Sequence, residues 1–281
     1  MREFKSVERL ARNSSRVLLL VLTVLSLGFS GCGKIKSAID SLLHAKRASK
    51  APSSHPGHPV VSGPRLAIIL DDVGSDPAAV DTIFSLRYPL TLSILPNHPH
   101  SAEIAQDAHQ HGYQIMLHLP MESVGNETPE AQELRPGMSQ ADIANTIASM
   151  LHTVPFAAGV NNHQGSLATS NPQLMAELMP VLRNHQLFFI DSRTTAATLA
   201  YDAAQNAGVP CAFRNVPFLD DVQEVSAVRH QLEIAAKDAR QKGQAVAIGH
   251  PHPATLRALA QFLPQAQSQG IHLVHASDLV H

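Results

Sequence analysis

Acidic and imidazole side chains recur at the ends of short apolar runs along this sequence of 281 residues. They are the adjacent pair Asp71 and Asp72, then His118, the segment Asn161-Asn162-His163, Asp191 and His250. Adjacent buried carboxylates repel one another when both are ionised, so their joint ionisation requires a nearby cation. A divalent metal ion is the simplest such cation, held by one Asp oxygen and two neutral imidazole nitrogens with a coordination position left open for water. The pattern therefore predicts a metal site.

These side chains can meet only if the apolar runs that carry them form neighbouring strands. Eight runs are nearly continuous rather than alternating, which is typical of strands covered on both faces. They are Leu66 to Leu70, Leu90 to Leu95, Gln114 to Leu117, Ala158 to Val160, Leu187 to Ile190, Pro210 to Phe213, Ala245 to Ile248 and Ile271 to Val274. On this interpretation the first strand ends in Asp71-Asp72, the third in His118, and the seventh in His250.

Helical patterns with matching start and stop residues lie between the apolar runs. Ser139-x-x-Asp142 and Asn171-Pro172 are typical helix starts, and glycines such as Gly208 and Gly243 stand where a helix should end. Alternating strands and helices predict a parallel sheet. Because the sequence has no G-x-G-x-x-G and no phosphate-loop motif, a (β/α) barrel is favoured over a nucleotide-binding open sheet. In such barrels functional residues gather at the carboxyl ends of the strands.

Composition excludes several classes of protein. The chain is 44% hydrophobic and 16% charged with a net charge of -2, so it lacks the basic character of a nucleic-acid-binding protein and the polarity of a disordered one. Two cysteines cannot form a disulfide framework or an all-thiolate zinc site. Any metal must therefore use His and carboxylate ligands.

Five segments in this order resemble the divergent polysaccharide deacetylase family, a branch related to the NodB-type carbohydrate esterases. They read LAIILDDVG, HLPME, GVNNHQGS, FFIDSRTT and AIGHPHP, and the resemblance covers Leu66 to His281. It implies a distorted barrel of about seven to eight parallel strands and metal-dependent deacetylation of an N-acetylated envelope or exported polysaccharide, with zinc the expected metal. It also implies that Asp71 is the catalytic base, Asp72 a metal ligand, and His250 the acid that protonates the departing amine.

The sequence departs from the family pattern at the third strand. The expected H-x-x-x-H motif, in which both His bind metal, reads His118 to Glu122 here, so the second His is missing. Either Glu122 or His163 takes its place, and His163 is preferred because imidazole preserves the charge of the site. The family's Arg motif is replaced by Asn161 to Ser166, and Trp is absent altogether. A non-catalytic glycan-binding or partner-organising lipoprotein that kept the barrel is therefore the alternative.

Four further residues are candidates for binding substrate: Glu122, Asp191, Arg193 and Arg214. Arg193 follows a strand end, where it is expected either to pair with Asp191 or to hold a substrate carboxylate. Arg214 lies in the segment FRNVPFLDD, where it can pin that loop by a bidentate contact.

The first 31 residues have the pattern of a bacterial lipoprotein signal. Basic residues precede an apolar run from Val17 to Phe29, which is too short for a comfortable membrane span. Phe29-Ser30-Gly31-Cys32 resembles the lipobox, which predicts lipidation of Cys32. The alternatives are an ordinary signal peptide with an incidental Cys and an uncleaved anchor, and either of them still places the domain outside the cytoplasm. Residues 33 to 64 are rich in Ser, Pro, Gly and Lys and are expected to form a flexible tether. We therefore expect an exported domain, residues 65 to 281, anchored at the periplasmic face, with an envelope protein partner possible but unspecified and no nucleic acid.

Overall fold

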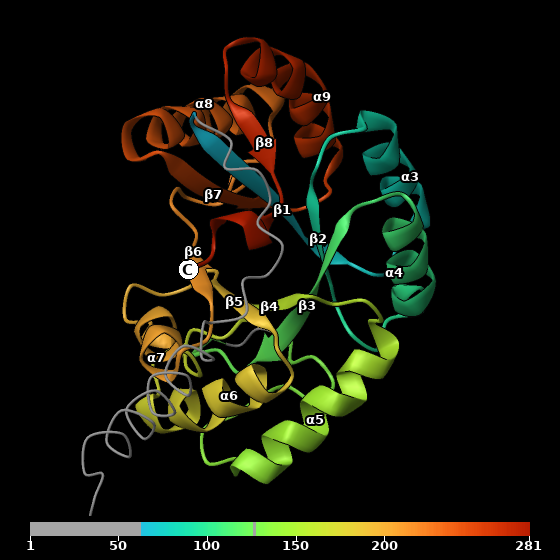
Figure 1. Cartoon of the computed structure of the whole chain (residues 1–281). Coiled ribbons are helices and arrows are strands. Elements are labelled where there is room, and N and C mark those ends of the chain that lie inside the picture. Colours follow the sequence, from blue (N-terminus) through green and yellow to red (C-terminus); the bar gives the residue numbers. More distant parts are fainter. Residues whose placement is uncertain (1–62, 126–127) are drawn as a thin grey trace, which may run out of the picture. The chain divides into compact units, whose positions relative to one another are not determined.

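A computed structural model describes residues 63–125 and 128–281, and the predicted signal segment, Cys32 and nearly all of the tether lie outside these residues. Strands and helices alternate through this part of the chain, with helices around the outside of the sheet (Figure 1). The strands are β1 (Arg65–Val73), β2 (Thr91–Ile94), β3 (Gln114–Met121), β4 (Gly159–Gln164), β5 (Phe188–Asp191), β6 (Cys211–Phe213), β7 (Gln244–Gly249) and β8 (His272–Val274). The helices are α3 (Pro77–Leu86), α4 (Ser101–Gln110), α5 (Gln140–Thr153), α6 (Pro172–Asn184), α7 (Ala200–Ala207), α8 (Val225–Lys242) and α9 (Pro253–Ser268).

The eight strands form one parallel sheet that nearly closes into a barrel. Its order is β6-β5-β4-β3-β2-β1-β7, and β8 pairs with the first residues of β1. Between β6 and β7 no regular strand pairing is present in the described residues, and Asn215 bridges the two instead. Its amide donates to the carbonyl of Val246 at 2.9 Å, and its side-chain oxygen accepts from the amide of Val246 at 2.7 Å. The predicted distorted (β/α) barrel is therefore confirmed.

The predicted helix boundaries are confirmed at the positions where the sequence contains capping residues. Ser139 and Asp142 form a reciprocal capping box at the start of α5. The Asn171 side chain accepts from the amide of Leu174, with Pro172 in the first turn of α6. Gly208 caps the end of α7 in the left-handed conformation with φ 69°, where a Cβ would be strained.

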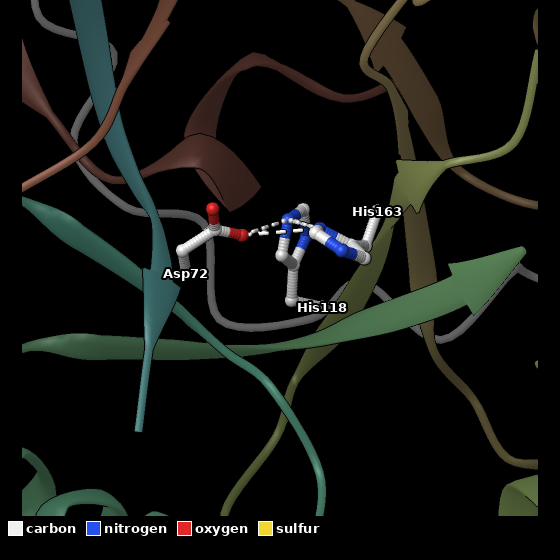
Figure 2. Close-up of side chains that lie close together, drawn as sticks. All are labelled: Asp72, His118 and His163. Carbon is white, nitrogen blue, oxygen red and sulfur yellow. Dashed lines mark hydrogen bonds and ion pairs between the residues drawn. The ribbon is translucent and has the colours of Figure 1, made fainter. Parts of the chain in front are cut away.

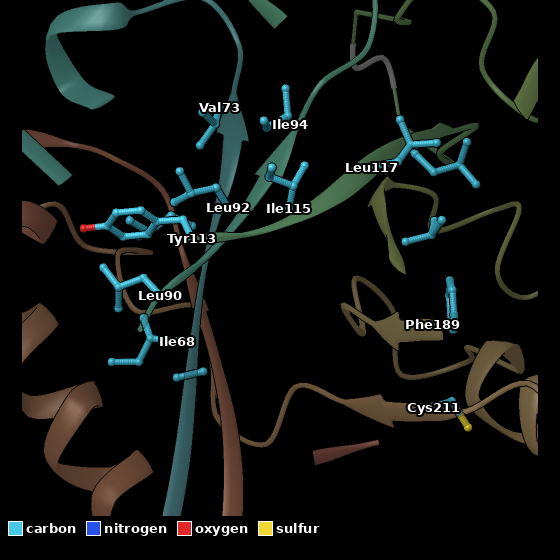
Figure 3. Packing of buried hydrophobic residues seen from close by; sticks show 14 of the residues in the cluster. Ile68, Val73, Leu90, Leu92, Ile94, Tyr113, Ile115, Leu117, Phe189 and Cys211 are labelled. Atoms are coloured by element: carbon cyan, nitrogen blue, oxygen red, sulfur yellow. The ribbon is translucent and has the colours of Figure 1, made fainter. Parts of the chain in front are cut away.

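Apolar side chains of each strand alternate between two buried clusters. In β1, Leu66, Ile68 and Leu70 pack outward against the helices, whereas Ala67 and Ile69 point into the barrel. Figure 3 shows the outer cluster, in which Ile68, Leu92 and Ile115 come from neighbouring strands. Burial on both faces explains why the strands read as continuous apolar runs in the sequence. None of the helices in the described ranges has the length and apolar character needed to cross a membrane.

The carboxyl-terminal segment closes the barrel at the amino ends of the strands. The short 3-10 helix η1 (Ala276–Leu279) buries Ala276 and Leu279 in the inner cluster. Its backbone is held by residues at strand starts: the hydroxyl of Thr91 accepts from the amide of Ala276 at 3.0 Å, and Arg65 donates to a carbonyl of η1 at 2.8 Å. The opposite end of the barrel, where the strands finish, is left for the functional side chains.

All eight predicted strands are present, but three of them run three or four residues further than expected. β1 continues to Val73, β3 to Met121 and β4 to Gln164, so Asp71, Asp72, His118 and His163 lie within strands rather than after them. Polar side chains at these positions face one another at the mouth of the barrel, the end at which the strands finish.

Candidate metal centre

A bulge in β1 turns two consecutive carboxylates toward the same mouth. The pairing register between β1 and β2 shifts between Leu70 and Val73, and Asp72 has a left-handed φ of 55°. Successive side chains of a regular strand point to opposite faces, and a bulge breaks this alternation. As a result both Asp71 and Asp72 approach His118 Nε2, at 3.6 and 3.2 Å. Only Asp71 is buried, because the Asp72 side chain remains 39% exposed.

Three ligand-type atoms converge beside this bulge (Figure 2). The Asp72 Oδ1 atom lies 3.2 Å from His118 Nε2 and 3.0 Å from His163 Nδ1. The two ring nitrogens are 3.1 Å apart. One carboxylate oxygen and two imidazole nitrogens form a set that suits zinc or a similar divalent ion. Of the two alternatives for the missing His, the structure places His163 in this cluster.

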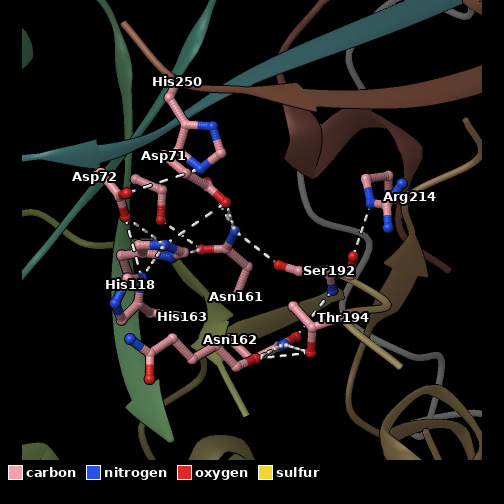
Figure 4. Close-up of polar contacts among 12 residues, drawn as sticks. Asp71, Asp72, His118, Asn161, Asn162, His163, Ser192, Thr194, Arg214 and His250 are labelled. Atoms are coloured by element: carbon pink, nitrogen blue, oxygen red, sulfur yellow. Dashed lines mark hydrogen bonds and ion pairs between the residues drawn. The ribbon is translucent and has the colours of Figure 1, made fainter. Parts of the chain in front are cut away.

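Asn161 sets the protonation of His118. Its Nδ2 donates to both oxygens of Asp71, at 2.9 and 3.1 Å, which requires its Oδ1 to face the other way. That oxygen lies 2.9 Å from His118 Nδ1 and also accepts the Ser93 hydroxyl. The network therefore assigns the ring hydrogen of His118 to Nδ1 and leaves the Nε2 lone pair directed at Asp72 (Figure 4).

The donor set fits a cation on electrostatic grounds. A lone pair on His118 Nε2 facing a carboxylate oxygen at 3.2 Å is repulsive unless a proton or a metal ion shares it. Burial alone would lower the pKa of His118, but the charges of Asp71 and Asp72 raise it above its ordinary value. Burial also acts to raise the pKa of Asp72, yet its contacts with the rings of His118 and His163 hold the pKa well below its ordinary value. The cluster thus attracts positive charge.

Asp71 differs from its neighbour because it is buried, with only 1% of its surface exposed. Desolvation raises its pKa above the ordinary value, although the charges of His118 and His250 offset part of the rise. A carboxylate with a raised pKa accepts a proton more readily, which suits a general base.

His250 approaches the same mouth from the end of β7, one residue beyond the strand. Its Nε2 lies 3.7 Å from Asp72 Oδ2, and its Nδ1 lies 3.0 Å from Asp220 Oδ1. Asp220 Oδ2 is fixed by the His250 amide at 2.6 Å and by the Thr255 hydroxyl at 2.8 Å. Burial lowers the pKa of His250, but the hydrogen bond to Asp220 and the charge of Asp71 outweigh it and raise the pKa to about 9. In the metal-free protein His250 is therefore protonated at neutral pH, with Nε2 toward the site.

Asp220 and His250, with His252, also form a second group of candidate ligand atoms. Both oxygens of Asp220 already accept hydrogen bonds, and His252 Nε2 lies 3.1 Å from Gln223. We therefore assign Asp220 the role of orienting His250.

The four expected substrate-binding residues occupy different environments. Asp191 is fully buried, and its oxygens accept from the Arg193 amide at 2.8 Å and the Thr198 hydroxyl at 2.9 Å. Arg214 is partly buried and donates to backbone carbonyls, including that of Ser192 at 2.7 Å. In this structure both residues hold the loop after β5.

Arg193 and Glu122 remain accessible. Arg193 is exposed, with its guanidinium stacked on Phe213. Glu122 is half-buried, and its side chain makes no hydrogen bond or ion pair with any residue in the described part of the chain.

Three contributors to the site were not assigned a role from the sequence. Asn161 was recognised only as part of a polar segment, and Ser192, which accepts from Asn161 Nδ2 at 3.1 Å, only as part of a motif. Asp220 was noted in its loop but not as the partner of His250. The signal for Asp220 in the sequence was the acidic pair that ends the segment FRNVPFLDD.

The sequence profile of a family described as divergent polysaccharide deacetylase matches residues 68–280. An uncharacterized protein of Escherichia coli (strain K12), YibQ, is 40% identical over 222 residues, which cover 79% of this chain and 69% of that protein. An uncharacterized protein of Haemophilus influenzae is 38% identical over 195 residues, covering 69% of each chain.

Solved structures share the fold at low sequence identity. An uncharacterized protein of Agrobacterium tumefaciens C58 superposes with a TM-score of 0.74 at 22% identity, covering 80% of this chain and 92% of that one. A CE4 family pseudoenzyme from Bacillus anthracis gives a TM-score of 0.53 at 11% identity, with 79% and 66% covered. The catalytic domain of a peptidoglycan N-acetylglucosamine deacetylase from Eubacterium rectale gives 0.50 at 12% identity, with 82% and 95% covered.

Proposed function

The chain belongs to the divergent polysaccharide deacetylase family, and from this premise we propose that it hydrolyses the acetamide of an N-acetylated polysaccharide. Asp72, His118 and His163 would hold a divalent metal ion, with zinc the expected metal. The convergence of these three ligand atoms carries the proposal. The orientation of Asn161 supports it, because it directs the His118 Nε2 lone pair into the cluster.

The chain's own residues supply the two proton transfers of the reaction. A divalent ion would polarise the acetamide carbonyl and lower the pKa of a water molecule that it binds. Asp71 takes the proton of the attacking water, whose oxygen forms the new bond to the acyl carbon. Asn161 keeps Asp71 in place through hydrogen bonds to both carboxylate oxygens.

His250 completes the hydrolysis. When the bond between the acyl carbon and nitrogen breaks, His250 gives its Nε2 proton to the departing amine. Asp220 holds the ring in the orientation that presents Nε2 to the mouth and stabilises the imidazolium. The products are acetate and the amino sugar as its ammonium ion, with a proton left on Asp71 and His250 neutral, so atoms and charge balance.

Metal analysis combined with acetate release tests the proposal. The protein should bind one divalent ion and release acetate from N-acetylglucosamine oligomers, and a chelator should abolish the release. Asp72→Ala should lose the metal, whereas Asp71→Asn should keep the metal and lose turnover. Asp107→Asn, on the exposed face of α4, is the matched control and should change neither.

Two results would count against this reading. Stoichiometric zinc in Asp72→Ala would show that the ligand assignment is wrong. Bound zinc without acetate from any glycan tested would favour the alternative, a non-catalytic glycan-binding or partner-organising lipoprotein that retained the barrel.

We also propose that the domain is exported and anchored at the periplasmic face of the envelope by a lipid on Cys32, where an envelope protein partner would be within reach. Support comes from the lipobox-like segment ending at Cys32, which lies outside the described residues. Cys32→Ala should move the protein from the membrane fraction to the soluble fraction, and unchanged membrane association would refute the lipid anchor.

A further inference from the structure

The loop that follows β5 holds Arg193 in a strained backbone conformation. Arg193 has a φ of 51°, a left-handed value that is uncommon for residues other than glycine, asparagine and aspartate. Such conformations cost free energy and persist only where the surrounding structure fixes them, often at ligand-binding positions.

Hydrogen bonds to buried and half-buried side chains hold the backbone of this loop. The Arg193 amide donates to Asp191 Oδ1 at 2.8 Å, and the Ser192 amide donates to Asn162 Oδ1 at 2.9 Å. Arg214 donates to the carbonyls of Ser192 and Arg193 at 2.7 and 2.9 Å. Two buried or partly buried charged side chains are thus used to position one exposed residue.

The guanidinium of Arg193 is held in place, but it has no polar partner among the residues that the structure describes. Its Cζ atom lies 3.5 Å from the centroid of the Phe213 ring, so one face of the planar group is stacked on the aromatic ring. No hydrogen bond or ion pair joins this guanidinium to any side chain in the described ranges. Burial raises the pKa of nearby Asp191, and the charge of Arg193 offsets only part of that rise. Its donor edge is therefore open to a ligand.

The loop is connected directly to the proposed reaction centre. Ser192, next to Arg193 in the chain, accepts a hydrogen bond from Asn161, which in turn donates to Asp71. These hydrogen bonds place Ser192 at the mouth, and Arg193 is the next residue of the chain. A stacked guanidinium presents a fixed pair of donors that matches the planar, bidentate geometry of a carboxylate.

We propose that Arg193 is a specificity-determining residue that binds a carboxylate on a sugar neighbouring the N-acetylated one. The preferred substrate class is an acidic glycan in which N-acetylated sugars alternate with carboxylate-bearing sugars. This inference rests on the proposed function for the identity of the glycan, but the binding of the carboxylate is measured without turnover.

Calorimetric titration of matched oligosaccharides tests the inference. The zinc-loaded Asp71→Asn protein is titrated with a neutral N-acetylglucosamine oligomer and with one of equal length in which glucuronic acid alternates with N-acetylglucosamine. We expect the acidic oligomer to bind about tenfold more tightly, a difference of about 1.4 kcal/mol. Adding Arg193→Gln should bring the ratio of the two affinities to about one, and Arg193→Lys should restore only part of it.

Arg240→Gln is the control for net charge, because Arg240 is exposed near the end of α8, where the chain enters the start of β7. It should leave the affinity ratio intact. Equal affinities for the two oligomers, or a ratio that survives Arg193→Gln, would overturn the inference. Stronger competition by inorganic phosphate than by free glucuronate would overturn the assignment of a carboxylate.

The binding test of Arg193 and the acetate-release test of the proposed function can fail independently of one another. Acetate release from neutral and acidic oligomers at equal rates, with equal affinities, would leave the deacetylase proposal standing and remove the role of Arg193. If the protein releases no acetate but its affinity ratio depends on Arg193, the role of Arg193 stands and the deacetylase proposal fails.

Discussion

Replacing Asp220 by Asn would remove the charge that keeps His250 protonated while preserving the shape of the side chain. Asp220 Oδ2 accepts from the His250 amide and the Thr255 hydroxyl, whereas Oδ1 faces His250 Nδ1 at 3.0 Å. In Asp220→Asn the carbonyl oxygen should occupy the first position, because two donors point at it. The amide nitrogen would then face Nδ1, which disfavours a hydrogen on that atom.

The expected magnitude follows from the pKa of His250, which rises from 6.5 to about 9. The hydrogen bond to Asp220 is the largest of the effects that raise this pKa. The charges of Asp71, Asp220 and Asp72 supply the rest. We therefore expect Asp220→Asn to lower this pKa by about 1 to 2 pH units, equivalent to about 1.4 to 2.7 kcal/mol. At pH 8, a fall to about 7.5 would reduce the protonated fraction from about 90% to about 25%.

The same pKa predicts how stability depends on pH. Because the folded-state pKa of His250 is raised, its contribution of about 3 kcal/mol is fully present below pH 6.5 and is lost as the pH rises through about 9. In the metal-free protein, this part of the pH dependence of the unfolding free energy should shrink in Asp220→Asn.

Nuclear magnetic resonance titration of the His250 ring in the metal-free protein measures the pKa directly. Asp221→Asn makes the same chemical change one residue along the chain at an exposed side chain, and His250 should titrate there as in the unmodified protein. If His250 in Asp220→Asn titrates within about 0.3 pH units of the unmodified protein, the assignment of Asp220 as its orienting partner is refuted.

Three further substitutions probe the site and the barrel. Asn161→Leu removes the acceptor that directs His118 and should weaken metal affinity about 10- to 100-fold in competition with a chromophoric chelator; an unchanged affinity would contradict the role of Asn161. Gly159→Ala would make the added Cβ clash with the Phe188 ring. We expect the free energy of unfolding, measured with denaturant, to fall by about 1 to 3 kcal/mol, and full stability would show that the ring can move aside. Leu279→Ala should lower the free energy of unfolding by about 2 to 5 kcal/mol, because it opens a cavity in the barrel interior, and it should leave metal affinity unchanged. A loss of metal in this variant would show that the two ends of the barrel are not independent.

Much of the scaffold could be predicted from local sequence patterns. Continuous apolar runs such as Leu66 to Leu70 identified strands buried on both faces, and Ser139 and Asn171 marked helix starts that the structure contains. These signals are local because they depend on the spacing of neighbouring residues and on capping groups within one turn. Parallel strands bring their carboxyl ends to one edge, so the sequence also indicated which polar residues would share a mouth.

The arrangement within that mouth depended on tertiary structure. No local sequence pattern predicts the bulge that turns Asp71 and Asp72 to the same side, because the bulge arises from the pairing register between β1 and β2. Asn161 meets Asp71 across 90 residues of sequence, and Asp220 meets His250 across 30. The sequence by itself determined the barrel and the kinds of side chain at its mouth. Only the packed strands decided which imidazole faces which carboxylate, because these hydrogen bonds join residues whose proximity is created by folding.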